Sequence, residues 1–135
     1  MPIMEWTDKL SVKINSIDDE HKKLVALINK LSDAMSQGQG HKALDDILIE
    51  LVDYTNYHFK YEEDALQKHN YPGFAKHKKM HQEFANKIGE TKTQYENGSI
   101  SLSIPIMNFL TSWLQNHIMK VDAEYSAFLI KAGMK

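Results

Sequence analysis

The sequence has no cysteine, few helix-breaking residues, no long apolar run and no marked excess of charge. With 0 Cys in 135 residues, disulfides, thiolate metal sites, iron–sulfur clusters and cysteine nucleophiles are all excluded. Any metal ion that the chain binds must therefore be held by nitrogen and oxygen atoms.

The charge and hydropathy patterns also exclude several classes of partner. The 16 basic and 18 acidic residues leave a formal net charge of −2, without the basic excess of a nucleic-acid-binding protein. No apolar run approaches the ~20 residues that span a bilayer, and the N-terminus lacks a basic stretch leading into an apolar one. We expect a cytoplasmic protein without nucleic-acid or membrane partners. Because the polar helix faces carry Lys, Asp, Asn and Gln with no evident apolar patch, we also expect a monomer.

Only 3 Pro and 6 Gly interrupt the chain. Between these breaks, apolar residues and histidines recur at steps of three and four, which places them on one face of a helix. The connections are short, so sequential helices should run antiparallel. The sequence therefore predicts an all-α, up-down-up-down antiparallel four-helix bundle that forms one domain over residues 1–135. The expected helices span about 17–37, 41–68, 72–96 and 103–131.

Two details of this bundle are less regular. The inward face of the fourth helix starts cleanly but continues less regularly with Val121, Glu124 and Phe128. Residues 1–15 should form an extended N-terminal arm that covers one end of the bundle with apolar side chains. Ser16 or Asp18 is expected to cap the first helix.

The histidines form the most informative pattern. Five of them fall on the inward faces, and two carboxylates accompany them at helical spacing. In an antiparallel bundle all of these positions lie at the same end. Neutral imidazole favours iron, zinc or copper, and a carboxylate can bridge two ions. The candidate metal ligands are His21, His58, Glu62, His77, His81, His117 and Asp122.

Alternatives without metal exist for each piece of this pattern. A single helix histidine is more often a hydrogen-bonded core or surface residue, and His58 with Glu62 could form an ordinary charge-assisted pair. However, burying five imidazoles with two carboxylates at one end would cost several kcal/mol unless they were paired or bound metal. We therefore favour a metal site. His41 and His69 lie in or beside turns and are interpreted as surface residues.

Seven ligands are too many for one zinc ion, which closes with four, but they suit two ions bridged by both carboxylates. His117 and Asp122 are five residues apart, an offset of about 140° on a regular helix. A local π-helical widening near residues 117–122 would bring both to one cluster. The Glu-x-x-His motif of ferritin-like di-iron enzymes is missing, and the site is rich in nitrogen. This favours mild chemistry with dioxygen over a monooxygenase.

The whole chain resembles the bacterial hemerythrins, which are non-haem di-iron, oxygen-binding helix bundles. The resemblance rests on four motifs in order, with no departure at a ligand position. They read IDDEHKKL at 17–24, HFKYEE at 58–63, HKKMH at 77–81 and WLQNHIMKVD at 113–122.

This resemblance implies a role for each ligand. One iron would be saturated by His77, His81 and His117, while His21 and His58 would hold a second iron that keeps a position open for dioxygen. Glu62 and Asp122 would bridge the two irons beside an oxo or hydroxo group. An apolar wall should keep water from the oxygen pocket, although plain core packing explains these residues equally well. Its candidates are Leu24, Phe59, Trp113, Leu114 and Ile118.

Three functions are compatible with such a centre. We favour a reversible carrier or store of dioxygen that is not an enzyme and serves an unidentified protein recipient. The second hypothesis is a di-iron enzyme, such as a peroxidase or a nitric oxide scavenger. Beyond the ligands, only Tyr61 or Glu63 offers it an acid–base group. The third is an oxygen or redox sensor, which would need a separate partner as its output because the bundle uses nearly the whole chain.

Overall fold

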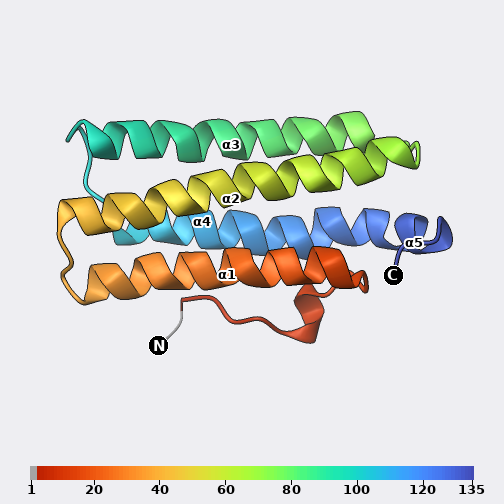
Figure 1. Cartoon of the computed structure of the whole chain (residues 1–135), viewed down its shortest axis with the longest axis horizontal. Coiled ribbons are helices and arrows are strands. Elements are labelled where there is room, and N and C mark those ends of the chain that lie inside the picture. The colour runs from red at the N-terminus through yellow and green to blue at the C-terminus, as the bar shows by residue number, and fades with distance from the viewer. Residues whose placement is uncertain (1–2) are drawn as a thin grey trace.

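The computed structural model describes residues 3–135 and confirms the all-α four-helix bundle. Four long helical segments, here called rods, lie side by side (Figure 1). The fourth rod is continuous in sequence but changes its helix type, from α to π and back to α. Within residues 3–135, no helix combines the length and apolarity needed to cross a membrane. The elements are α1 (Asn15–Ser36), α2 (His41–Lys68), α3 (Phe74–Glu96), α4 (Ile104–Asn116), the π-helical η2 (His117–Asp122) and α5 (Ala123–Lys131).

Tight turns reverse the chain between the rods. Gly38 follows α1 with φ of 69° and Gly98 follows α3 with φ of 81°, in the left-handed region that a residue without Cβ enters at little cost. The inward faces of α1, α2 and α3 are buried at the predicted spacing, as Leu24, Ile28 and Leu31 illustrate on α1. The apolar core therefore runs along the bundle axis.

The fourth rod departs from the expected register. The sequence predicted that its inward face would continue through Val121, Glu124 and Phe128, but Glu124 is exposed and the other two are only half-buried. The buried positions are instead Ile118, Asp122, Tyr125 and Leu129. The predicted π-helical segment, which is present at His117–Asp122, explains the difference. The π-helical segment adds one residue to the helical turn, so each inward-facing position after it falls one residue later in the sequence.

The N-terminal arm follows a longer path than expected. Residues 1–2 of the predicted arm lie outside the described residues, and the rest contains one 3-10 turn, η1 (Asp8–Leu10). It runs beside α1 (Figure 1). Met4 is buried, and its backbone N–H and carbonyl form two hydrogen bonds with the Asn29 side chain, at 3.0 and 2.7 Å. Val12 and Ile14 pack with Leu66, Tyr125 and Leu129. The arm thus covers α1 along one side and the bundle at one end.

The expected cap of the first helix was wrong. The N-cap is Ile14, and neither Ser16 nor Asp18 caps the helix. The largely buried Asp18 carboxylate instead accepts hydrogen bonds from the Val12 backbone N–H at 2.8 Å and the Ser11 hydroxyl at 2.6 Å. A carboxylate in the first turn of the helix therefore holds the arm rather than the helix end.

Replacing Asp18 should release the arm. Asp18→Ala leaves the Val12 N–H buried without its acceptor, so we expect the free energy of unfolding to fall by about 1–3 kcal/mol. Urea unfolding followed by circular dichroism measures this, with Asp19→Ala as the matched control because Asp19 is exposed. Equal stabilities for the two variants would contradict the anchoring role.

Candidate metal centre

The seven predicted ligands converge at one end of the bundle, where α1 begins, α2 ends, α3 begins and η2 lies. All are nearly or completely removed from solvent. Their exposed fractions are 0% for His21, Glu62 and Asp122, 1% for His58 and His81, 2% for His77 and 5% for His117. Four rods thus place one cluster of nitrogen and oxygen donors in the interior.

Glu62 lies at the centre of this cluster. Its Oε2 is 2.9 Å from His21 Nε2 and 2.8 Å from His58 Nε2. Its Oε1 is 3.1 Å from His77 Nε2 and 3.3 Å from His81 Nε2. The two oxygens of one carboxylate therefore face two different groups of histidines.

Asp122 repeats this arrangement from the other side. Its Oδ2 is 3.2 Å from His21 Nε2, while its Oδ1 is 3.2 Å from both His77 Nε2 and His117 Nε2. His81 Nε2 and His117 Nε2 are 3.1 Å apart, so these two nitrogens point at one place. We call His77, His81 and His117 the three-histidine group, and His21 with His58 the two-histidine group.

The donor set fits two metal ions. Atoms that bind one ion at right angles with bonds of about 2.1 Å are about 3.0 Å apart, which is the spacing seen here. Both Asp122 oxygens are buried without a well-formed hydrogen bond to any described residue, which is costly unless another group satisfies them. The donors form two sets that share Glu62. Nitrogen and oxygen donors in this ratio suit a non-haem iron site.

Charge stabilises the cluster before a metal ion binds. Burial alone would lower the pKa of His58, but the Glu62 charge and the hydrogen bond with Glu20 raise it to about 10. Burial likewise opposes the charge on His77, but the adjacent carboxylates of Asp122 and Glu62 raise its pKa to about 9. Burial favours the neutral form of Glu62, yet the His58 charge and the hydrogen bonds with histidines hold its pKa well below the usual range. Imidazolium–carboxylate pairs therefore occupy the centre at neutral pH.

Two further carboxylates orient the imidazoles. Nδ1 of His58 donates to Glu20 at 2.7 Å, and Nδ1 of His81 donates to Glu63 at 2.9 Å. Such a bond fixes the ring so that Nε2 points into the cluster. No spacing or motif indicated Glu20, which is 38 residues from its partner. Of the acid–base candidates, Glu63 is thus engaged with His81, while the hydroxyl of Tyr61 donates to Ser16 at the surface.

Sequence reasoning also missed Tyr125. This side chain is fully buried, and its hydroxyl donates to Glu62 Oε2 at 3.0 Å. The signal in the sequence that could have indicated Tyr125 was the less regular inward face predicted for the fourth helix. Shifting the register by one residue after the π-helical segment moves Tyr125 to an inward position. Its hydroxyl then holds the carboxylate that both groups of histidines share.

The five residues predicted for an oxygen pocket lie in the core cluster beside the centre or pack against it. Leu24, Leu114 and Ile118 are buried. The other two stack on histidines. The ring centroids of Phe59 and His81 are 3.8 Å apart, and those of the half-buried Trp113 and His117 are 4.4 Å apart. These two aromatic side chains therefore pack against the three-histidine group, and the apolar wall of an oxygen pocket stays a prediction for all five residues.

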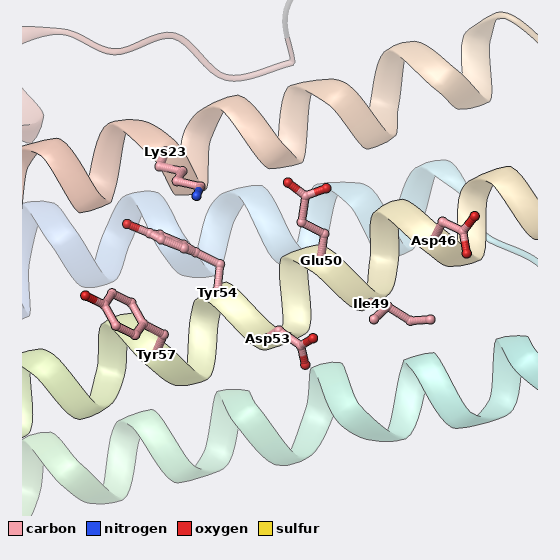
Figure 2. A pocket seen from close by; sticks show the side chains of 7 residues that line it. All are labelled: Lys23, Asp46, Ile49, Glu50, Asp53, Tyr54 and Tyr57. Carbon is pink, nitrogen blue, oxygen red and sulfur yellow. The ribbon is translucent and has the colours of Figure 1, made fainter.

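A broad groove on the outer face of the bundle is separate from the centre. It lies between α1 and α2 (Figure 2), and the Lys23 ammonium sits 4.4 Å from the Tyr54 ring centroid. None of the seven candidate ligands lines it. The groove is lined by Lys23, Asp46, Ile49, Glu50, Asp53, Tyr54 and Tyr57.

Comparisons with known proteins agree with this centre. Residues 12–129 match the family model described as the hemerythrin HHE cation binding domain. A bacteriohemerythrin of Pseudomonas aeruginosa is 37% identical over 125 residues, covering 93% of this chain and 80% of that protein. A bacteriohemerythrin of Methylococcus capsulatus is 32% identical, covering 96% and 98%. A crystal structure of wild-type hemerythrin superimposes with a TM-score of 0.90 at 32% identity, covering 94% and 98%. The chain belongs to the hemerythrin family.

Proposed function

We propose that this protein binds dioxygen reversibly at a non-haem di-iron centre, as a carrier or store. One observation carries the proposal: Glu62 and Asp122 each direct one oxygen to the three-histidine group and the other to the two-histidine group. This is the arrangement that two bridged ions require. Membership of the hemerythrin family supports iron as the metal.

The two groups of histidines would hold the ions unequally. His77, His81 and His117, with one oxygen from each carboxylate and a solvent-derived oxo or hydroxo bridge, would complete an octahedral shell around one ion. His21 and His58 would leave one position open at the other ion. The chemistry supplied by a bound ferrous pair is a two-electron reduction of dioxygen that is reversed when dioxygen leaves. The protein must keep the pair in place and water out.

The surrounding side chains serve both requirements. Glu20 and Glu63 hold the imidazoles of His58 and His81, and the Tyr125 hydroxyl holds Glu62. Leu24 and Ile118 have exposed fractions of 1%, so this aliphatic wall is shielded from bulk water. Excluding water protects a reduced centre from side reactions.

The contacts of the centre favour a carrier over an enzyme. Catalysis such as peroxide reduction would use a proton donor near the open position. The Tyr125 hydroxyl already donates its hydrogen to Glu62, so it offers no free proton for this role. Glu63 is already paired with His81.

An optical experiment tests the proposed function directly. The iron-loaded protein is reduced under anaerobic conditions, exposed to oxygen and then evacuated. We expect a charge-transfer band in the visible region that appears with oxygen and disappears under vacuum over repeated cycles. Irreversible oxidation on first contact with oxygen would contradict a carrier or store.

Removing the shared carboxylate should abolish the di-iron site. Among residues 3–135, Glu62 is the side chain that contacts four of the ligand histidines, two in each group, so we expect Glu62→Ala to bind fewer than two irons per chain. Elemental analysis measures this after loading. Asp64→Ala is the matched control, since Asp64 is exposed on the same helix and pairs only with Lys60. Full iron content in Glu62→Ala would refute the bridging role.

Iron binding should release protons. At neutral pH the raised pKa values, about 10 for His58 and about 9 for His77, keep both imidazoles protonated before metal binds. A ligand must give up this proton, so apparent ferrous affinity should fall as the pH is lowered, by about tenfold per unit for each proton displaced. Anaerobic titration in weakly buffered solution at pH 6.5 and 8 measures both the protons and the affinity. An affinity independent of pH would contradict the assigned charge states.

A further inference from the structure

The centre is closed to solvent, so an iron ion needs a way in. Of the seven candidate ligands, His117 has the largest exposed fraction, 5%, and His77 follows with 2%. Both belong to the three-histidine group, where α3 faces η2. A route for filling and emptying this centre rests on the proposed function, because it presupposes that the centre binds iron.

His117 lies on the wall of a surface cleft of about 240 Å³ between α3 and the fourth rod. Besides this imidazole, the cleft offers the Glu83 carboxylate and the Asn116 amide oxygen, with Lys120 also in its lining. Carboxylate and amide oxygens can replace coordinated water on a ferrous ion, whereas the methylenes of an apolar wall cannot. The cleft therefore places two oxygen donors beside a candidate iron ligand, although the rest of its lining, Met80, Trp113 and Val121 among it, is largely apolar.

Two other clefts that reach the three-histidine group are less suitable. The cleft at His77, beside Glu124, has a volume of about 50 Å³. Six waters need roughly 60–90 Å³ by the same measure, so a hydrated ion does not fit there. In the cleft at His81, Glu63 already accepts the Nδ1 hydrogen bond, and Phe59 covers the ring. That cleft has the room, about 170 Å³, and the amide oxygens of Asn56 and Gln82, but His81 has an exposed fraction of 1% against 5% for His117. Of these three clefts, the one at His117 therefore combines sufficient room with the most exposed candidate ligand.

We propose that ferrous ions enter and leave the centre through the His117 cleft. Oxygen atoms of Glu83 and Asn116 replace waters of the hydrated ion one for one, and His117 is the first imidazole that the ion reaches. The ion stays ferrous throughout, so the step needs no oxidant or reductant. Glu83 acts on the route only, because it is exposed and outside the donor sets of the centre.

The charges in the cleft predict effects of opposite sign. Glu83 attracts a divalent cation on the route, so Glu83→Gln should slow both uptake and release by roughly three- to tenfold. Lys120 repels the same cation, so Lys120→Gln should accelerate both. Each substitution changes the barrier between bulk solvent and the centre but not the ligands at either end of the route. The final iron content and affinity should therefore stay those of the wild type.

The experiment follows both directions under anaerobic conditions. Stopped-flow absorbance records uptake of ferrous ion by the iron-free protein, and a ferrous chelator records release from the reduced, loaded protein. Glu124→Gln at the His77 cleft and Glu50→Gln in the α1–α2 groove are matched controls, since each removes the same charge elsewhere. We expect wild-type rates for both controls. The effects of Glu83→Gln and Lys120→Gln should shrink at high salt.

Several outcomes would overturn the route. Unchanged rates in Glu83→Gln would do so, as would equal slowing in Glu124→Gln, which would indicate a general effect of net charge. Faster release with lower iron content in Glu83→Gln would show that Glu83 stabilises the centre rather than the route. A wild-type protein that takes up no iron would instead refute the proposed function, and the route with it. Two bound irons with unaltered rates in every variant would refute the route alone.

Discussion

The pairing of Glu62 with four imidazoles is the interaction on which the rest of this structure depends. Five imidazoles and two carboxylates in an apolar interior would be strongly destabilising if any of them lacked a partner. Each Glu62 oxygen instead contacts two Nε2 atoms at 2.8–3.3 Å, and these contacts come from α1, α2 and α3. One carboxylate thereby ties three rods together, and the same contacts that offset its burial arrange the donors for two ions.

The fourth rod joins this cluster only because its helix changes type. His117 and Asp122 are both buried, although five residues separate them and a regular helix would turn one of them away. The π-helical segment accommodates this spacing and also rotates Tyr125 inward, where its hydroxyl contacts Glu62. A local irregularity therefore has three consequences: it adds the Asp122 carboxylate and the His117 imidazole to the cluster, and a hydrogen bond that holds Glu62.

Much of the fold and the centre could be predicted because periodicity is a local property. Steps of three and four placed His77 and His81 on one face, and antiparallel topology placed the other candidates at the same end. Contacts between rods could not be predicted in this way. Glu20 reaches His58 across the α1–α2 interface, and no spacing encodes that pair. The predicted cap of the first helix was wrong for a related reason. The Asp18 carboxylate accepts a hydrogen bond from the Val12 N–H, which only the path of the arm brings near.

The two sides of the centre meet opposite demands. A dioxygen site must exclude water, while a metal site must admit a hydrated ion at least once. At the two-histidine group, His21 and His58 have exposed fractions of 0% and 1%. At the three-histidine group, the His117 imidazole stacks on the Trp113 ring and lines a surface cleft that also contains Glu83 and Asn116. Glu62 contacts both groups of histidines, so an ion that enters at the three-histidine group lies next to the two-histidine group. Separating the two demands in space removes the need for any large opening of the bundle.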